Sequence, residues 1–417
     1  MTRMTLCSAV LACIAQSMAL HAAPYCGAFL EPEAMPAQYA RLAPVLSNTD
    51  TGWIFTQDQL REDYGLKPRN AVLLEQIAQA FERQGMQLAI LMPPPRPLAA
   101  GQAVLDETAA GAPAIDVART AKSFSEMTAQ VRRMGILMPD LSLLALDRGA
   151  AAPFYFGRDT HWTPFGAALS ARALAGAVLS GATLPAPVPG AGMYEERGSL
   201  SGMARKICGV ELAPETAPFA VLPATGGGLL DPDGSGPRAV LAGSSFSDRY
   251  KRDAYRVADA LSAYLGRPVE NRSVSGGGAI GAIEGLVSSG MLRRGQYDLV
   301  IWELPYTESL NKESALRQLL GALVLAGGKL EVSAAVLTPG APLKIPPGGP
   351  LPVLVRADSL PLGVQRHTVE IRYRDRKPTR IKLQRKDRVP SGMREGPWAV
   401  SLAELPSADV QSISLMP

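Results

Sequence analysis

The chain has 417 residues, of which 47% are hydrophobic, so it is long enough for two or three domains and can bury a sizeable core. Charged residues make up 19% and there are 35 prolines, which favours long loops over intrinsic disorder because apolar residues remain plentiful. The formal net charge is +4. The sequence contains no nucleic-acid-binding motif, so we expect no nucleic-acid partner.

The first residues predict an export signal. Arg3 supplies a short positive region, residues 6–20 are apolar apart from three polar positions, and small residues follow. This stretch is too short and too interrupted to span a bilayer, and no later stretch reaches about 18 uninterrupted apolar residues. We expect a signal peptide over residues 1–23, with cleavage after Ala19, Ala22 or Ala23. The alternative is an uncleaved core helix.

Export would leave two cysteines. Removing residues 1–23 takes away Cys7 and Cys13, so Cys26 and Cys208 remain. Two cysteines in an exported protein are expected to form one disulfide, with two unpaired thiols as the alternative. The disulfide would close a loop of about 180 residues, for which the chain-entropy description gives roughly 4–5 kcal/mol of stabilisation.

Apolar strands alternate with helices up to about residue 327. Continuous apolar runs predict strands buried on both faces at residues 88–92, 238–242 and 298–302. Helical patterns lie at residues 72–84, 124–134, 164–178, 252–265, 279–291 and 314–325. This alternation predicts an α/β domain with a largely parallel central sheet over residues 24–327.

The pattern changes after residue 327. Short alternating runs, such as Val369, Ile371 and Tyr373 with polar residues between them, predict strands with one face in contact with water. Proline and glycine interrupt these runs repeatedly. We therefore expect a small all-β domain over residues 328–417.

Positive charge is concentrated in this C-terminal part. Residues 329–417 carry 14 Lys plus Arg against 8 Asp plus Glu, a net of +6, which leaves the rest of the chain at −2. Ten of the basic residues lie between Arg366 and Arg388, with Arg372 and Arg374 among them. On alternating strands they would form a basic face that attracts polyanions. The alternative is a solvated face that protects a sheet edge from aggregation.

Histidine is scarce, which narrows the search for a catalytic base. Beyond residue 23 only His161 and His367 remain, and His367 lies in the basic β region, where a carbohydrate contact or a surface position is expected. Asp159 stands two positions before His161, so on an extended or loop backbone both side chains project to the same side. The carboxylate can then orient the imidazole and stabilise its protonated form. A purely structural Asp–His hydrogen bond is the alternative.

Ser245 is the candidate nucleophile. It lies in the segment GSSFS, residues 243–247, directly after the strand expected at residues 238–242. A turn there places its hydroxyl at the carboxyl end of a parallel sheet, where α/β folds build their sites. A helix-like stretch after the turn would offer N–H groups to an oxyanion. The alternative is a serine-rich loop that caps a helix, which Ser244 and Ser247 would fit.

Four segments together resemble blocks of the AlgX/AlgJ family of polysaccharide O-acetyltransferases. They are residues 157–163 (GRDTHWT), 243–247 (GSSFS), 52–55 (GWIF) and 302–305 (WELP). The Asp and His precede the Ser, which is similar to the circularly permuted SGNH hydrolase-like order of that family. The resemblance covers roughly residues 26–325, and Cys26 and Cys208 are placed as in the AlgX disulfide. The departures are the absence of any cysteine after Cys208, and Tyr306 where relatives often carry arginine.

The resemblance implies a function. Ser245 would be the nucleophile, His161 the base and Asp159 the residue that orients the base. The protein would be a periplasmic enzyme that acetylates hydroxyls of an anionic exopolysaccharide, alginate in the first instance, through an acetyl-serine intermediate and without a cofactor. The acetyl group would come from a membrane partner, and polymer-export proteins would be further partners. Residues 328–417 would be a β-sandwich carbohydrate-binding module.

Further residues are weaker candidates for substrate binding. They are Arg249, Tyr250 and Lys251 just after Ser245, Arg96 at the end of its strand, Tyr306, and Arg372 and Arg374 in the basic region. The first three could equally belong to a solvated helix start. No spacing of His and Cys indicates a metal site, and no glycine loop of the nucleotide-binding type is present.

Two other functions stay open at this point. An acetylesterase would use the same triad with water in place of the sugar, and water exclusion and acceptor affinity would decide between the two activities. A non-catalytic scaffold that binds polymer during export would need none of the three catalytic side chains.

Overall fold

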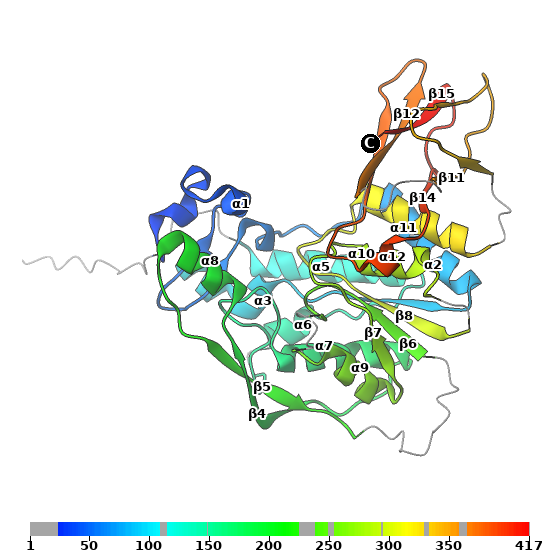
Figure 1. The fold of residues 1–417 in the computed structure, drawn as a ribbon. Helices are drawn as coiled ribbons and strands as arrows, with labels where there is room; N and C mark the ends of the chain where they lie inside the picture. Colours follow the sequence, from blue (N-terminus) through cyan, green and yellow to red (C-terminus); the bar gives the residue numbers. More distant parts are fainter. Residues whose placement is uncertain are drawn as a thin grey trace, which may run out of the picture.

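The computed structural model describes residues 24–108, 115–147, 149–224, 238–248, 254–292, 295–328, 333–357 and 365–416. The expected signal peptide therefore lies outside the described residues. An α/β part and a smaller all-β part lie against one another, and the labels used below are those of Figure 1. Among the described residues, every helix falls short of the length and hydropathy that a membrane span requires.

A four-stranded parallel sheet forms the centre of the larger part. Its strand order is β3–β8–β6–β7, with bounds Gln87–Leu91, Tyr297–Glu303, Arg238–Ala242 and Val269–Asn271. Residues 239–242 and 299–303 are buried throughout, because helices cover both faces of the sheet. The prediction of a parallel sheet built from continuous apolar runs is confirmed, and β7 is an additional short strand.

Two groups of helices enclose this sheet (Figure 1). One contains α2 (Pro68–Arg83), α10 (Gly281–Ser288) and α11 (Glu313–Ala326), and the other contains α7 (Pro164–Val178) and α9 (Val257–Leu265). α7 begins where the sequence predicts, because Pro164 occupies its first turn and the Thr163 hydroxyl accepts the Gly166 N–H.

Three helix starts differ from the sequence prediction. α2 begins at Pro68 instead of residue 72, because Pro68 occupies its first turn. α5 spans Val117–Arg132 and begins before residue 124, because the Asp116 side chain caps it by accepting the Arg119 N–H. α9 begins later than residue 252, because Arg256 has a left-handed backbone conformation with φ 56°, which a helix cannot continue through.

Two small sheets form the C-terminal part. One has the order β10–β15–β12–β13 (Leu343–Lys344, Val410–Met416, Arg366–Tyr373 and Thr379–Gln384), and the other β14–β11–β9 (Trp398–Ser401, Leu354–Ala357 and Ala334–Val336). Buried side chains from both, including Val355, Ile371 and Ile413, form one apolar core. The predicted strands of this part are therefore confirmed, and a short helix, α12 (Ser391–Arg394), accompanies them.

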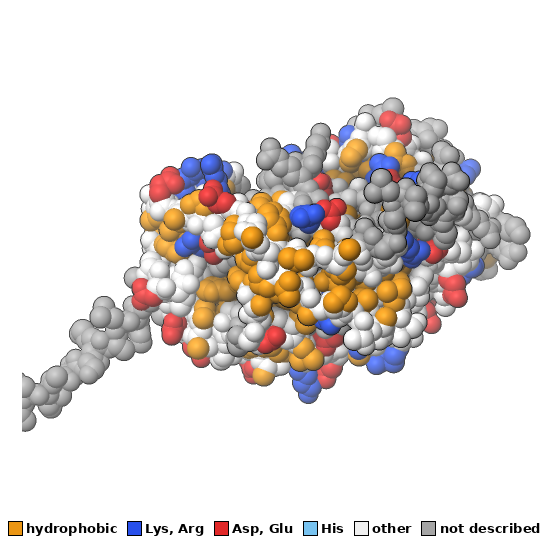
Figure 2. All heavy atoms as spheres, turned by 90° about the horizontal axis from the view of Figure 1, so that it is seen from below, with side chains coloured by type: hydrophobic (Ala, Val, Ile, Leu, Met, Phe, Trp, Pro, Cys, Tyr) orange, Lys and Arg blue, Asp and Glu red, His pale blue; other side chains and the backbone are white. Residues whose placement is uncertain are grey.

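The remaining elements lie in the N-terminal segment, around the sheet and in a hairpin. They are η1 (Gly27–Leu30), η2 (Pro32–Ala34), α1 (Ala37–Ala40), β1 (Leu46–Ser47), β2 (Ile54–Phe55), η3 (Gln57–Gln59), α3 (Arg96–Ala100), α4 (Gln102–Thr108), α6 (Ser142–Leu146), β4 (Val188–Glu196), α8 (Ser199–Cys208) and β5 (Glu215–Val221). β4 and β5 form an antiparallel hairpin that the sequence pattern does not predict. Val188 and Val221 pair across it and are each more than half exposed, and hydrophobic side chains gather on the face seen in Figure 2.

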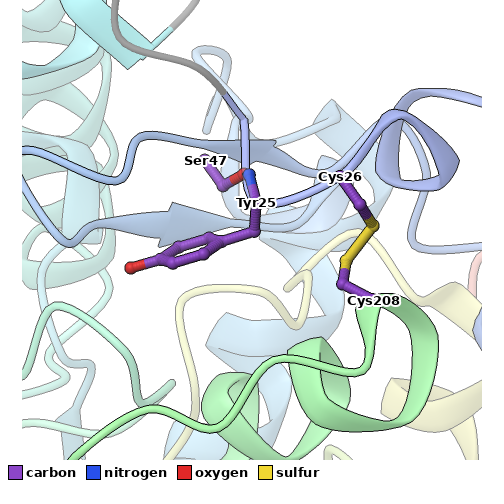
Figure 3. Close-up of a disulfide and its surroundings, with 4 residues drawn as sticks. All are labelled: Tyr25, Cys26, Ser47 and Cys208. Atoms are coloured by element: carbon purple, nitrogen blue, oxygen red, sulfur yellow. A yellow bond between two sulfur atoms is a disulfide. The ribbon is translucent and has the colours of Figure 1, made fainter.

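Cys26 and Cys208 form a disulfide, as the sequence predicts (Figure 3). The two residues are 182 positions apart, so the bond joins the N-terminal segment to the last residue of α8. Beside it, the Tyr25 N–H donates to the Ser47 hydroxyl at 3.2 Å, which ties this segment to β1. α8 is therefore anchored at its C-terminal end.

The two parts meet at a buried junction. Val389 and Met393 belong to the C-terminal part and yet pack in the main core of the α/β part. Gly321 of α11 lies so close to β14 that a Cβ atom there would approach the Val400 nitrogen to 2.5 Å. We propose a domain boundary at residues 327/328, between α11 and β9, with the two domains held rigidly by this shared apolar surface.

A buried ion pair crosses the junction. Glu284 on α10 and Arg385 after β13 have side chains that are 2% and 3% exposed, and Arg385 Nη2 lies 2.7 Å from Glu284 Oε1. Arg385 also donates to the carbonyl oxygens of Arg394, Gly396 and Pro397. The pair therefore ties α10 to the chain that leads into β14.

Replacing Glu284 with glutamine is expected to destabilise the protein by about 3–5 kcal/mol, because Arg385 then stays buried without its counter-ion. Urea unfolding followed by circular dichroism measures this loss. Asp259→Asn is the matched control, since the Arg256–Asp259 pair is half exposed and its loss should cost about 1 kcal/mol or less. Equal effects of the two substitutions would contradict a structural role for the junction pair.

Candidate active site

Ser245 lies in the turn that follows β6. This turn, residues 243–247, is called the serine loop below, and it stands at the carboxyl edge of the central sheet. A Cβ atom at Gly243 would lie 2.5 Å from Glu303 Oε2, so only glycine fits there. The Ser247 and Asp248 N–H groups donate to the Ser244 carbonyl oxygen, which closes the turn around Ser245.

Asp159 and His161 lie in a second loop, which precedes α7. Tyr155 and Trp162 form an isolated antiparallel bridge, so the chain between them makes a compact turn. The Trp162 ring is buried, and its indole N–H donates to the Phe246 carbonyl oxygen of the serine loop at 3.0 Å. This bond joins two loops whose residues are 84 positions apart.

The structure brings the three candidate catalytic side chains together. His161 Nε2 lies 2.9 Å from Ser245 Oγ, and His161 Nδ1 lies 2.5 Å from Asp159 Oδ1. Asp159 Oδ1 also accepts the His161 N–H at 2.8 Å. Asp159 is fully buried and His161 is 8% exposed. With Nδ1 bonded to the carboxylate, Nε2 faces the serine hydroxyl, which is the arrangement needed to remove its proton.

α8 supplies a contact that the sequence analysis missed. Asp159 Oδ2 accepts the N–H of Ser199, the first residue of α8, at 2.5 Å. The carboxylate thus sits at a helix N-terminus, where the helix dipole stabilises negative charge. Gly198 precedes the helix with φ 79°, and a Cβ atom there would lie 2.4 Å from the Arg158 carbonyl oxygen. Because α8 ends at Cys208, the disulfide anchors the helix that holds Asp159.

Aromatic rings enclose the imidazole. The ring centroids of Phe246 and Tyr255 lie 4.8 and 5.6 Å from that of His161. The Tyr255 hydroxyl donates to Glu196 Oε2 at 3.2 Å, so the end of β4 supports this wall. Neither Tyr255 nor Glu196 was predicted, because their contacts with the site exist only in the folded chain.

A family model describes most of this part of the chain. The SGNH hydrolase-like domain of the acetyltransferase AlgX matches residues 47–306, which contain all three candidate catalytic residues. The chain belongs to the AlgX family.

Two curated proteins illustrate the relationship. The chain is 29% identical over 303 residues to the alginate biosynthesis protein AlgX of Pseudomonas putida. The aligned residues cover 69% of this chain and 61% of that protein. It therefore spans about three fifths of the length of that relative. It is also 26% identical over 129 residues to the probable alginate O-acetylase AlgJ of Pseudomonas putida, covering 30% of this chain and 32% of AlgJ.

A solved structure shares the fold. The chain matches the structure of Pseudomonas aeruginosa AlgX with a TM-score of 0.68 and 21% identity, covering 94% of this chain and 96% of that one. The predicted SGNH hydrolase-like α/β fold with C-terminal strands is confirmed by this match and by the AlgX family model.

Arg96 does not point into the site, so the prediction that it binds substrate is wrong. Its side chain is fully buried, and the guanidinium donates to the carbonyl oxygens of Ile54, Phe156 and Gly157 and to Gln59 Oε1. All four acceptors lie in the α/β domain, and two belong to the loop that leads into Asp159 and His161. In this AlgX-family chain the arginine therefore holds that loop in place.

Tyr306 is also a core residue, contrary to the sequence prediction. The side chain is buried, and its ring packs edge-on against Tyr155. Burial raises the pKa of its phenol, so the group is neutral and adds no charge to the site. Arg61 donates to the Tyr306 carbonyl oxygen at 2.7 Å, which places a guanidinium beside this position.

The other predicted contacts fall into two groups. Arg249, Tyr250 and Lys251 lie outside the described residues. Arg372 and Arg374 are exposed in the C-terminal domain, and the Arg372 guanidinium pairs with the buried Glu370 at 2.6 Å. A role for both in sugar binding stays a prediction.

The sequence predicted a carbohydrate contact or a surface position for His367, but the structure places this residue in the interior. It is buried and packs edge-on against Trp398 in the core of the C-terminal domain. Burial lowers its pKa, which favours the neutral ring. Packing therefore explains this histidine.

A groove follows the junction between the domains. Its volume is about 400 Å³, and residues 277–280 of the loop after β7 form one wall. This loop contacts the chain after the serine loop, because the Ser275 N–H donates to Asp248 Oδ2 at 3.1 Å. The charged residues of the lining are Glu308, Lys312, Glu313, Lys382 and Lys386. Lys312 and Arg317 pair with the two glutamates, so Lys382 and Lys386 make the groove positive.

Arg96→Lys is expected to lower the free energy of unfolding by about 2–4 kcal/mol, because one ammonium group cannot serve four acceptors arranged around a guanidinium. Urea denaturation gives the value, and Arg83→Lys at the exposed end of α2 is the control that should change little. Unchanged stability together with a raised KM for an acetyl donor would show that Arg96 contacts substrate instead.

Proposed function

We propose that this member of the AlgX family is a periplasmic O-acetyltransferase that acetylates an anionic exopolysaccharide, alginate in the first instance, through acetyl-Ser245. The observation that carries the proposal is the 2.9 Å contact of His161 Nε2 with Ser245 Oγ, while Asp159 binds the other ring nitrogen. A serine hydroxyl is a weak nucleophile until a base takes its proton, and these contacts provide the base and its orientation.

In the first step, Ser245 Oγ attacks the carbonyl carbon of the acetyl donor while its proton passes to His161 Nε2. The bond to the leaving group of the donor then breaks, and the imidazolium returns the proton to the departing atom. The buried Asp159 carboxylate stabilises the imidazolium in between. The Ser245 N–H has no acceptor among the described residues, so it can donate to the oxyanion of the tetrahedral intermediate.

In the second step, a sugar hydroxyl takes the place of the leaving group. His161 Nε2 accepts its proton, and the sugar oxygen attacks the carbonyl carbon of acetyl-Ser245. The ester bond to Ser245 breaks, Ser245 Oγ regains the proton from His161, and the acetylated sugar leaves. The same imidazole thus serves as base and acid in both steps, and no cofactor takes part.

A polyuronate acceptor is supported by charge and by the relatives. Lys382 and Lys386 give the junction groove a positive wall, and residues 329–417 carry a net charge of +6, which attracts a polyanion. The relatives include an alginate biosynthesis protein and a probable alginate O-acetylase. We therefore place the C-terminal domain as the carbohydrate-binding module that brings polymer to Ser245.

The proposed compartment follows from the expected signal peptide and from the Cys26–Cys208 disulfide, because disulfides persist in oxidising compartments such as the periplasm. Acetyl-CoA belongs to the cytoplasm, so a membrane partner is proposed to deliver the acetyl group. Polymer-export proteins are the further proposed partners.

Exposure to p-nitrophenyl acetate is expected to add one acetyl group to Ser245, seen by mass spectrometry of the intact protein and its peptides. Ser245→Ala should gain none, because the attacking oxygen is missing. Ser289→Ala is the control, since that hydroxyl donates to the Leu286 carbonyl oxygen of α10 and accepts the Met291 N–H, and it should behave like the wild type.

The same reaction, run with polymannuronate oligomers, separates the alternatives. Acetylated oligomers are the expected product, whereas free acetate alone would identify an acetylesterase. Polymer acetylation that persists in the Ser245→Ala protein would identify a non-catalytic scaffold.

Replacing Lys382 and Lys386 together by glutamate is expected to raise the KM for polymannuronate oligomers roughly tenfold, because the positive wall of the groove becomes negative. Formation of acetyl-Ser245 should be unchanged, and the effect should shrink at high salt. Lys377→Glu is an exposed control outside the groove. Point substitutions are needed because Val389 and Met393 pack in the main core, so deleting the C-terminal domain would expose that core. An unchanged KM would place the polymer elsewhere.

A further inference from the structure

Glu303 lies directly under the serine loop. It is the last residue of β8, and its neighbour Trp302 pairs with Ala242, the last residue of β6. The Glu303 side chain is therefore next to Gly243, where the loop begins, and the carboxyl is 1% exposed. The two steps proposed above do not use this group.

The carboxylate of Glu303 binds the serine loop on both sides of Ser245. Its Oε2 accepts the Ser244 N–H at 2.6 Å and the Ser247 hydroxyl at 3.1 Å. The Ser244 hydroxyl lies 2.9 Å from Oε2 and 3.0 Å from Oε1. The same hydroxyl accepts the Phe246 N–H at 3.2 Å, so the bonds reach each residue that adjoins the nucleophile.

An ionised carboxylate suits this arrangement because it only accepts hydrogen bonds. One N–H and two O–H groups converge on Glu303, and all three can donate to it at once. A protonated acid would carry an O–H on one oxygen, so a hydroxyl that donates to that oxygen would have to turn away or accept instead. The three donors that converge on Glu303 therefore suit its charged form.

We infer that Glu303 is a positioning residue that, in its ionised form, holds the serine loop so that Ser245 Oγ stays within reach of His161 Nε2. The inference rests on the proposed function, since it assigns a role around the proposed nucleophile. Glu303 acts through Ser244 and Ser247 and does not contact the reacting atoms.

Protonation of Glu303 is expected within the working pH range. Burial raises its pKa from 4.5 to about 7, while hydrogen bonds from Ser244 and Ser247 and the charge of His161 oppose the rise. Among the described residues, the titratable groups that interact with Glu303 are His161 and Tyr155. Burial raises the pKa of the Tyr155 phenol well above 10, so that group stays neutral.

Activity and stability should then respond to pH in opposite directions. The folded-state pKa of about 7 exceeds the usual value of 4.5, so the folded protein binds this proton more tightly than the unfolded chain does. As the pH rises from 4.5 towards 7, ionisation of Glu303 therefore lowers the free energy of unfolding. Over the same pH range, the ionised carboxylate completes its hydrogen bonds to the serine loop, which should raise kcat. If Glu303 served only the fold, its ionisation would not raise kcat while it lowered the free energy of unfolding.

Glu303→Gln tests the inference with p-nitrophenyl acetate as the acetyl donor. The kcat should fall about 10- to 100-fold with little change in KM, because a small displacement of the nucleophile has an effect of this size. The pH profile of kcat, measured from about pH 5 to about pH 9, should lose one ionisation that the wild type shows in addition to that of the histidine base. The variant should be at least as stable as the wild type at high pH and should lack the stability change between pH 4.5 and 7.

Two further variants sharpen the test. Ser247→Ala removes one hydroxyl that lowers the Glu303 pKa, so it should reduce kcat several-fold and move the lower limb of the pH profile to higher pH. Glu270→Gln is the matched control on β7, an edge strand of the same sheet, where the carboxylate binds Tyr297 and Arg272 instead of the serine loop, and it should keep the wild-type profile.

Wild-type kcat and pH profile in Glu303→Gln would overturn the inference, as would a loss of activity that only parallels a loss of folded protein. Ser245→Ala distinguishes this failure from failure of the proposed function. If Ser245→Ala is inactive and Glu303→Gln is fully active, only the role of Glu303 is refuted. If Ser245→Ala still forms the acetylated product, the proposed function is refuted whatever Glu303→Gln does.

Discussion

The hydrogen bond between His161 and Ser245 depends on two loops that are far apart in the sequence and must meet within a few tenths of an ångström. Trp162 joins the loops by donating to the Phe246 carbonyl oxygen, and Asp159 holds the ring from its other side. The contacts are buried, where hydrogen bonds are electrostatically stronger than in water and costly to lose. Small errors in either loop would therefore separate the base from the hydroxyl.

Asp159 and Glu303 are buried carboxylates at the candidate site, and each accepts hydrogen bonds from neutral donors. Asp159 accepts backbone N–H groups of His161 and of Ser199 at the start of α8, and Glu303 accepts one backbone N–H and two hydroxyl groups. Such donors are fixed by the backbone and add no second charge that could attract a substrate carboxylate. The junction differs, because Glu284 is compensated there by a full ion pair with Arg385. Carboxylates at the candidate active site are thus compensated differently from the carboxylate that joins the domains.

Under the proposed function, the junction also sets where a polymer would lie. α11 and β14 are in such close contact that Gly321 has no room for a Cβ atom, and Val389 and Met393 extend the main core into the C-terminal domain. The groove lined by Lys382 and Lys386 is therefore held at a constant position relative to the loop after β7, which contacts the chain next to Ser245. A rigid arrangement of this kind lowers the entropy lost when a flexible polymer binds.

The sequence by itself determined β3, β6 and β8 of the central sheet but not the short β7, because continuous apolar runs need burial on both faces and few other structures accept them. It also determined the three candidate catalytic residues, because scarcity of histidine, the Asp-x-His spacing and a serine after a buried strand are local features. Only the tertiary structure decided that Arg96 and Tyr306 are core residues and that Ser199, Tyr255 and Glu303 surround the site. Their roles depend on burial and on donors from distant segments, and neither residue type nor spacing records which backbone groups will face a side chain once the chain has folded.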